Sequence, residues 1–221
     1  MTRNTSQDTE GRVREAALRL FAAHGFEATG IRDIARDAGV STAALYHYMS
    51  SKHDLLIDIM RDGLHRLTAG ARAVIQDVNT PAERLAALVR WHILYHGREQ
   101  LMSLVSDNEL RALSSSQLKS MIKLRDRYEI LWRDTLADGV ESGDFHVRNP
   151  KLTRLALLHM CSGVVYWYSP AGELALPAIA EELVELALAM VGYKASDPAG
   201  ASGAGLGEAS PDLAELAKEK Q

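Results

Sequence analysis

The chain contains a single cysteine, Cys161, among its 221 residues. An intramolecular disulfide is therefore excluded, and the apolar neighbours in LLHMCSGVV predict a buried, unreactive thiol rather than a redox sensor. Long apolar runs are missing as well, because no stretch reaches the roughly 18 residues needed to cross a bilayer. The first residues, MTRNTSQDTEGR, are polar and unlike a secretion signal. We expect a cytoplasmic protein with no membrane partner.

Positive charge is also scarce. The net charge is −4, and residues 1–53 hold seven Lys and Arg against six Asp and Glu, a net of +1. Such a balance argues against a protein that coats nucleic acid through bulk electrostatics. Residues 41–53 nevertheless contain no carboxylate, so sequence-specific binding by this segment remains compatible with the charge.

Strand patterns are absent, whereas helix start signals recur. Thr80-Pro81-Ala82-Glu83 and Ser114-Ser115-Ser116-Gln117 have the pattern of capping boxes. Asn149-Pro150 combines a capping residue with a proline at the first helical position. The sequence predicts an all-α fold, with helices over about 11–24, 52–76, 81–96, 114–138, 149–168 and 177–191.

Residues 25–56, GFEATGIRDIARDAGVSTAALYHYMSSKHDLL, predict two short helices joined by a tight turn. Gly39 can adopt the left-handed conformation that ends a helix, and Ser41 can cap the next one. In the second helix, about 41–48, Leu45 and Tyr48 are placed to pack inward. The remaining positions face outward, as in a helix that enters the major groove of DNA.

This stretch resembles the amino-terminal DNA-binding domain of the TetR family of transcriptional repressors. The resemblance implies an amino-terminal three-helix helix-turn-helix domain joined to a larger helical ligand-binding and dimerisation bundle. It also implies that Lys52 contacts phosphate and that Thr29 contacts the DNA backbone. The expected DNA-contacting residues are Thr29, Ser41, Thr42, Ala43, Ala44, Tyr46, His47 and Lys52. A compact three-helix module that never binds DNA is the alternative.

The chain is long enough for one small and one medium domain. We expect a flexible amino terminus over 1–8 and a DNA-binding domain over 9–69, with its motif at about 32–51. The ligand-binding and dimerisation domain is expected over 70–194. Residues 195–221, which are rich in Gly, Ala and Ser before a short charged end, predict a flexible tail.

The last two long helices are apolar on more than one side, so they need cover from more than the chain's own core. A homodimer supplies that cover, and it also places two recognition helices about 34 Å apart on a palindromic operator. The expected interface residues are Leu158, Cys161, Val165, Leu183, Leu186 and Met190. A monomer with an unusually apolar bundle is the alternative.

A small-molecule effector is expected in a mostly apolar pocket between helices. The candidate lining residues are Trp91, His92, Tyr95, Arg125, Tyr128, Trp132, His159, Tyr166 and Trp167. Alternatively, each of these residues lies in the core or in the dimer interface and contacts no ligand. His92 and His96 have the i, i+4 spacing of a metal pair, but HILYH lacks the glutamate of metalloproteases and no further ligands are indicated. We expect no metal, no cofactor and no enzyme activity, since no nucleophile–base pair is visible.

Residues 108–145 and the segment YWYSPAG at 166–172 are similar to the TetR subgroup that responds to acyl-CoA thioesters. That resemblance implies an acyl chain in the pocket and CoA phosphates near Arg111, Arg125 or Arg127. Ser169 stands where the subgroup often has arginine. Three alternatives remain open. The first is a regulator of an efflux or other catabolic operon with a different apolar ligand. The others are a structural nucleoid factor and a helical-bundle enzyme.

Overall fold

The computed structural model describes residues 2–194, with side chains from residue 8 onward. Every regular element in this range is helical and no strand occurs there, which confirms the predicted fold class. None of the helices in the described range is long and apolar enough to span a bilayer. The predicted tail over 195–221 lies outside the described residues.

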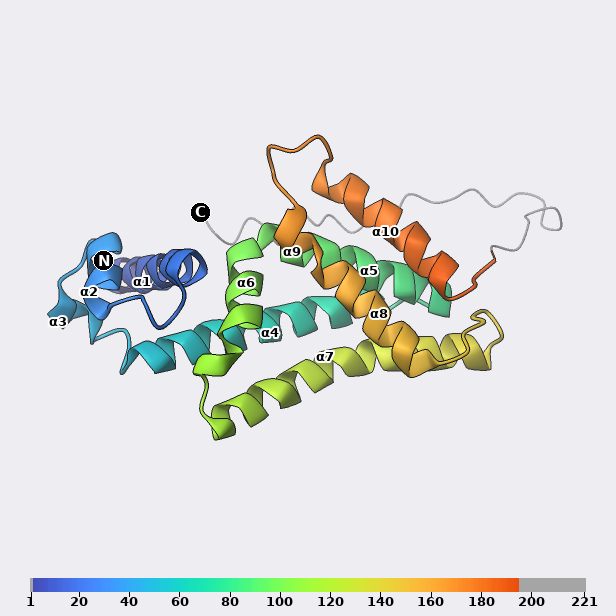
Figure 1. The fold of residues 1–221 in the computed structure, drawn as a ribbon, viewed down its shortest axis with the longest axis horizontal. Helices are drawn as coiled ribbons and strands as arrows, with labels where there is room; N and C mark the ends of the chain where they lie inside the picture. The colour runs from blue at the N-terminus through green and yellow to red at the C-terminus, as the bar shows by residue number, and fades with distance from the viewer. Residues whose placement is uncertain (1, 195–221) are drawn as a thin grey trace.

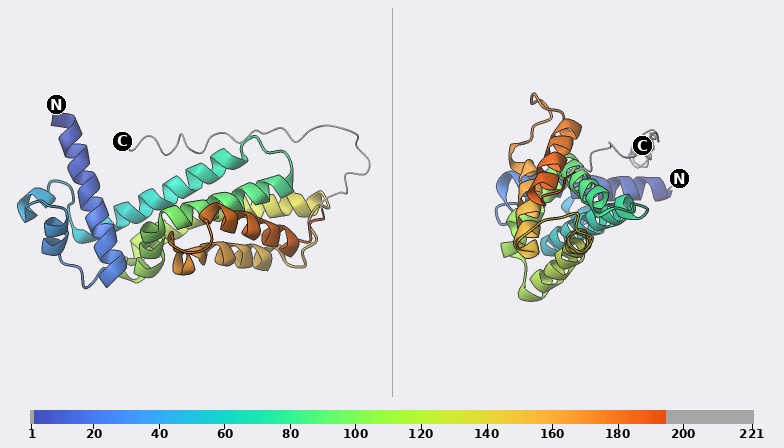
Figure 2. Two further views of the ribbon diagram at one scale, coloured as in Figure 1. Left: turned by 90° about the horizontal axis from the view of Figure 1, so that it is seen from above. Right: turned by 90° about the vertical axis from the view of Figure 1, so that its right-hand side faces the viewer.

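A small helical module forms one end of an elongated molecule, and a larger bundle forms the rest (Figures 1 and 2). The elements are α1 (Thr2–His24), α2 (Ile31–Asp37), α3 (Thr42–Leu45), α4 (Lys52–Ile75), α5 (Pro81–Arg98), α6 (Gln100–Asn108), the short 3₁₀ helix η1 (Glu109–Ala112), α7 (Ser115–Glu141), α8 (Pro150–Ser162), α9 (Val164–Trp167) and α10 (Leu176–Met190). The long helix α4 connects the small module to the bundle.

The turns of the small module follow the sequence signals. Gly25 and Gly39 adopt φ values of 81° and 67°, which confirms that Gly39 takes the left-handed conformation. The Ser41 side chain caps α3 by accepting a hydrogen bond from Ala44 N. Leu45 is fully buried, as predicted, so the inward face of the motif is anchored in the core.

Two expected helix bounds in this module are wrong. Helix α1 begins at Thr2 rather than at about residue 11, and an Asp8–Arg12 ion pair at i, i+4 spacing supports its first part. The recognition helix is a single α-turn. After Leu45 the chain continues through i→i−3 hydrogen bonds, from His47 N to Ala44 O and from Tyr48 N to Leu45 O, which tighten the turn.

In the larger bundle the predicted helix starts are confirmed. The Ser114–Gln117 capping box is complete, Thr80 accepts from Glu83 N, and Asn149 accepts from Leu152 N. The predicted end of α5, at about residue 96, lies close to its observed end at Arg98, but the sequence did not predict α6, because no capping side chain marks its start. The predicted helix over 149–168 is interrupted after Ser162, so α9 is a separate short element.

Two apolar cores lie under the two parts of the molecule. The first is built from α1 to α3 and the beginning of α4, and it also takes in Met102 and Val105 from α6, Leu113 from the turn after η1 and Met121 from α7. The second fills the bundle around Trp132. Since α6 and α7 contribute to the first core, the small module is packed directly against the helices of the larger one.

Helix α7 approaches the following loop closely at Gly139, so a larger residue there is expected to lower the stability of the fold. A Cβ there would lie 2.0 Å from the Phe145 ring, which is buried in the second core. We expect Gly139→Ala to destabilise the protein by about 1–3 kcal/mol through overpacking. Gly11→Ala, in α1 with no neighbour within 4 Å, is the control and is expected to stabilise by about 0.8–1 kcal/mol. Denaturant midpoints at one fixed protein concentration measure both; equal midpoints would contradict the packing argument.

Candidate DNA interface and ligand cavity

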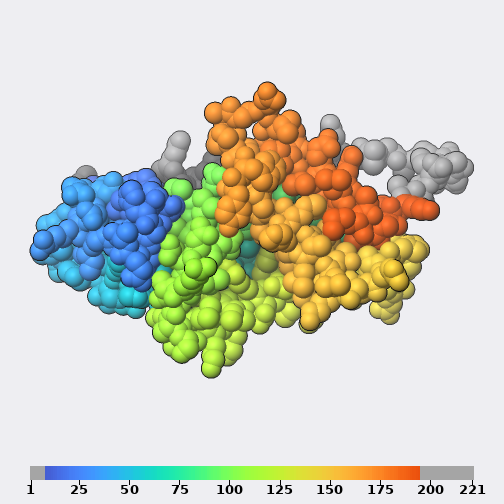
Figure 3. Space-filling view, in the orientation of Figure 1, coloured from blue at the N-terminus to red at the C-terminus, as the bar shows by residue number. Residues whose placement is uncertain are grey.

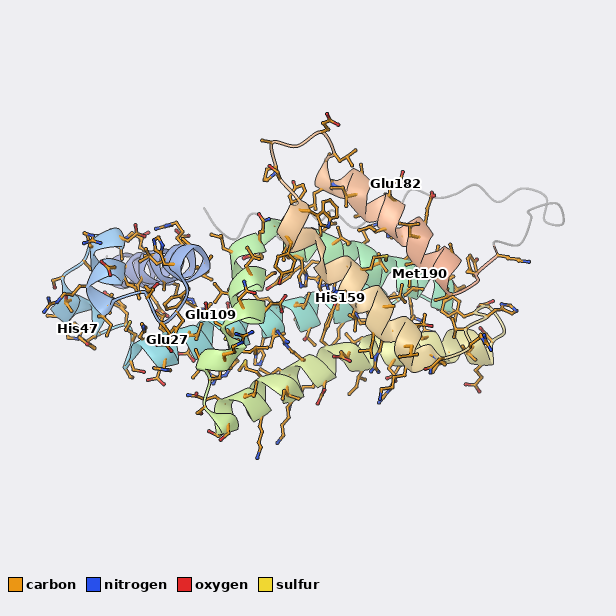
Figure 4. All side chains as sticks on the ribbon, viewed as in Figure 1. Glu27, His47, Glu109, His159, Glu182 and Met190 are labelled. Carbon is orange, nitrogen blue, oxygen red and sulfur yellow. The ribbon has the colours of Figure 1, made fainter. Side chains whose placement is uncertain are left out.

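The outward face of α3 lies at the far tip of the small module, where Figure 4 labels His47. Tyr46 is 52% exposed, and His47, Ser41 and Ala43 are also exposed. Thr42 and Ala44 are half-buried on the same turn. The structure thus brings six of the eight predicted DNA-contacting residues together on one protruding turn that carries no acidic side chain.

The other two, Thr29 and Lys52, are engaged inside the module. Thr29 is buried, and its hydroxyl donates to Gly25 O at 2.8 Å. The Lys52 ammonium donates to Phe26 O at 2.7 Å and Thr29 O at 2.8 Å, and it lies 4.2 Å from the centre of the Phe26 ring. In this structure both residues hold the loop between α1 and α2, and two of the three N–H donors of the Lys52 ammonium are used there. Lys52→Ala is therefore expected to loosen this loop.

One cation that the expected set omitted lies on α2. Arg32 is exposed and has no hydrogen-bond or ion-pair partner in the described part of the chain, whereas Arg36 is paired with Asp33 at 2.6 Å. The first helix of a helix-turn-helix crosses the phosphate backbone. Arg32 is therefore a candidate phosphate contact, and its only signal in the sequence is a cation on the outer side of α2.

A cavity of about 170 Å³ lies between α4, α5, α6, α7 and α8. On the face seen in Figure 3, the surface is hollowed between α6, α7 and α8. Of the predicted ligand-binding residues, four line the cavity: His92, Tyr95, Arg125 and Tyr128. The wall contributed by α6, which the sequence did not indicate, consists of Met102, Ser103, Ser106 and Asp107.

The other five predicted ligand residues do not line this cavity. Trp132 is buried in the second core, and the Trp91 indole donates to Leu67 O at 2.9 Å. His159, Tyr166 and Trp167 are exposed on α8 and α9. The sequence placed aromatic residues on the correct helices, but a helical period alone does not decide which side of each helix meets the cavity.

The polar part of the cavity is organised around His92. Its two ring nitrogens lie 2.7 Å from the Tyr128 hydroxyl and 3.0 Å from the Ser162 hydroxyl. The His96 ring stacks on His92 with ring centres 3.9 Å apart. Burial lowers the pKa of both imidazoles, and for His92 the neighbouring His96 lowers the pKa further. Both rings are therefore neutral at neutral pH. At the edge of the cavity, Arg125 bonds Asp107 at 2.9 Å.

The neutral histidine pair predicts an acid-sensitive fold. Unfolded histidines bind protons below about pH 6.5, whereas the buried rings resist protonation, so stability falls as the pH drops below that value. Each histidine contributes at most about 1.4 kcal/mol per pH unit, over the interval between its unfolded and folded pKa. Urea unfolding at pH 7.5, 6 and 5 measures the effect. The slope should diminish in His92→Gln, and it should persist in the control His65→Gln, which changes an exposed residue on α4.

Apolar side chains are exposed along α8 and α10, which lie on the same side of the bundle (Figures 1 and 2). Leu152 and Leu155 are exposed on α8, and Leu186, at 53%, and Met190 are exposed on α10. Figure 4 shows His159 of α8 and Met190 of α10 on this side. Among residues 8–194, this is a place where two neighbouring helices both present large apolar groups to solvent.

The expected interface set needs a correction on α8 and α9. Cys161 and Val165 are buried in the chain's own core, with the pKa of the Cys161 thiol raised to about 12 by burial. They offer no surface to a partner. Leu158 and Leu183 are half-buried against the same core. The α8 helix carries two neighbouring apolar stripes, and the stripe chosen from the sequence is the one that faces inward.

The small module is a three-helix unit whose α3 protrudes, begins at the Ser41 cap and follows the tight turn at Gly39. This arrangement defines the class of helix-turn-helix DNA-binding regulators. Residues 13–59 match the family described as "Bacterial regulatory proteins, tetR family". Residues 78–191, more than half of the chain, match "Tetracyclin repressor-like, C-terminal domain". The chain belongs to the TetR family, and it is a transcriptional repressor of the TetR type.

Known members are similar over most of their length. The HTH-type transcriptional repressor KstR2 of Mycobacterium tuberculosis is 28% identical over 185 residues, covering 80% of this chain and 90% of KstR2. PfmR, a TetR family regulator from Thermus thermophilus, is 31% identical with a TM-score of 0.75, covering 80% and 97%. AibR, solved with isovaleryl coenzyme A and operator DNA, shares the fold at 24% identity and a TM-score of 0.74, covering 80% and 97%.

Proposed function

We propose that the chain is a homodimeric repressor that leaves a palindromic operator when a small effector, an acyl-CoA thioester, enters the cavity between α4 and α8. The observation that carries this proposal is the position of the cavity. Its α6 wall stands directly before η1, and η1 touches the DNA-binding module. The division into a DNA-binding domain over 9–69 and a ligand-binding and dimerisation domain over 70–194 is part of the proposal.

DNA recognition is assigned to α3 and the turn after it. The methyl groups of Thr42, Ala43 and Ala44 suit contacts with thymine methyls. Tyr46 and His47 are exposed polar groups that suit phosphates, and Arg32 on α2 adds a phosphate contact. The module carries little positive charge, so tight binding requires two copies. The exposed apolar groups of α8 and α10 provide a surface for a second copy.

The link from the cavity to the DNA-binding module is assigned to Glu109. This residue follows α6 directly, and its Oε1 accepts a hydrogen bond from Phe26 N at 3.1 Å. The Lys52 ammonium holds the carbonyl oxygen of the same phenylalanine. Figure 4 labels Glu109 between α6 and the small module. A shift of the α6 wall on ligand entry would therefore move Phe26 and, through it, the loop that carries α2 and α3.

Several features favour a thioester effector. AibR, which shares the fold, was solved with isovaleryl coenzyme A, whereas KstR2 is described as a ketosteroid transcriptional regulator, with no thioester named. The cavity, at about 170 Å³, is below the roughly 300–1,000 Å³ of sites for drug-sized ligands. It suits an acyl group, with the nucleotide part left at the edge near Arg125. Arg111 and Arg127 are exposed cations on η1 and α7 that suit CoA phosphates.

Release of operator DNA tests the proposal. An operator duplex is first selected from random-sequence DNA, and short, branched and ring-bearing acyl-CoAs are then titrated into the complex while fluorescence anisotropy is followed. We expect at least one thioester to release the DNA at micromolar concentration, and free CoA to be without effect. Failure of every thioester would contradict the effector assignment and favour the alternative, a repressor of an efflux or other operon that senses a different apolar ligand.

A further inference from the structure

One hydroxyl in the wall of the cavity has no partner. Ser103 is 5% exposed, lies on α6, and its Oγ forms no hydrogen bond with any described residue. A buried polar group without a partner costs free energy, typically about 1–3 kcal/mol, and such groups in folded proteins call for an explanation. Ser103 is one of the residues that line the cavity, so a bound molecule is the candidate partner of its hydroxyl.

A second group in the wall offers the opposite hydrogen-bonding role. The Nδ1 of His96 lies 2.9 Å from His92 O, and a carbonyl oxygen only accepts, so Nδ1 carries the proton. The ring is neutral, since burial lowers its pKa. Its Nε2 is therefore an acceptor, and no described residue donates to it. His96 and Ser103 both line the cavity.

Most of the other polar groups of the wall already have partners, and Glu129 is paired with Arg154. His92 uses both ring nitrogens on Tyr128 and Ser162, the Tyr95 hydroxyl donates to Gly63 O at 2.8 Å, and Arg125 is bound to Asp107. Apolar contacts come from Leu64, Leu67, Met102 and Leu158. The wall thus combines an apolar part with the buried hydroxyl of Ser103 and the acceptor of His96, and the half-buried Ser106 also lies in it.

We propose that the part of the effector that enters this cavity carries an alcohol hydroxyl, which donates to His96 Nε2 and accepts from Ser103 Oγ. A ketone pairs only with Ser103 and leaves His96 without a donor. A saturated hydrocarbon group leaves both groups without partners, so its binding gains neither hydrogen bond. The proposal rests on the proposed function, which places the effector in this cavity, and it narrows the effector to a hydroxylated acyl group.

The cavity itself is tested first, with probes that contain no thioester. Isothermal titration of the full chain with cyclohexanol, cyclohexanone and methylcyclohexane compares a hydroxyl, a ketone and a methyl group on one ring. We expect cyclohexanol to bind at least about tenfold more tightly than methylcyclohexane, with the ketone between them. Equal affinities, or no binding of cyclohexanol at its solubility limit, would overturn the proposal.

Ser103→Ala and Ser120→Ala form the matched pair of variants. Ser103→Ala should reduce the preference for the alcohol to about threefold or less while leaving stability unchanged or raised, because it removes an unpartnered hydroxyl. Ser120 is exposed on α7, and its substitution should change nothing. If Ser103→Ala keeps the full preference for cyclohexanol over methylcyclohexane, the ligand hydroxyl does not bind Ser103, and the proposal is contradicted.

Operator release then separates this inference from the proposed function. Butyryl-CoA, 3-hydroxybutyryl-CoA and acetoacetyl-CoA have the same carbon chain, and we expect the hydroxyacyl thioester to release DNA at the lowest concentration. Equal release by all three would overturn the inference and leave a thioester-responsive repressor. An alcohol preference in the cavity without release by any thioester would support the inference and overturn the thioester assignment.

Discussion

Leu186→Glu is expected to convert the proposed homodimer to monomers and to weaken operator binding at least about 100-fold. Leu186 is exposed on α10, so the substitution leaves the chain's own core intact. In a two-fold interface the change places two carboxylates in one apolar surface, where burial of unpaired charge is costly. A monomer presents one recognition turn and loses the half-site pairing on which specific affinity depends.

Light scattering after size exclusion and an operator titration measure the two effects. Ile122→Glu is the matched control, because Ile122 is a similarly exposed apolar residue on α7, away from α8 and α10. It should leave both the mass and the operator affinity unchanged. A Leu186→Glu protein that stays dimeric, or a monomer that binds the operator as tightly as the unmodified chain, would refute the interface assignment.

Glu109→Ala is expected to uncouple effector binding from DNA release. The variant loses the contact between η1 and Phe26, but no residue of the cavity changes. Effector affinity without DNA should stay within about twofold. The ratio of operator affinities without and with saturating effector should fall at least about fivefold, since allosteric coupling of about 1–3 kcal/mol corresponds to 5–150-fold.

Two further variants separate coupling from general damage. Glu109→Gln keeps an oxygen that accepts from Phe26 N, and it should retain most of the coupling. Glu27→Ala changes an exposed carboxylate in the same region (Figure 4) and should behave like the unmodified chain. If Glu109→Ala responds to effector as strongly as these two proteins, the coupling runs through other contacts between α6 and the small module.

Local signals allowed much of the fold to be predicted. Capping at Ser41, Ser114 and Asn149 and the left-handed Gly39 depend on a few neighbouring residues, and the structure confirms them. Helix α6 was missed because no capping signal marks its start: the residue before it, Glu99, has φ −103° and ψ 41°, and its side chain forms no capping hydrogen bond. Such a helix start depends on the packing around it rather than on local sequence.

The sites were predicted less completely, for reasons that involve distant parts of the chain. Lys52 was assigned to phosphate, but its ammonium finds two carbonyl oxygens in the loop before α2. Cys161 lies on one of two similar apolar stripes of α8, and only packing against the other helices decides which stripe is inward. The α6 wall with Ser103 was missed because a serine in a helix has no distinctive pattern.

Selection of binding sites from random-sequence duplex DNA tests the central claim most directly. The chain should enrich a palindrome whose half-site centres lie about 34 Å, or a whole multiple of this, apart. Tyr46→Ala should enrich the same sites with lower affinity. Absence of any enriched sequence, or enrichment of single half-sites by the unmodified chain, would contradict a dimeric repressor that reads DNA through α3.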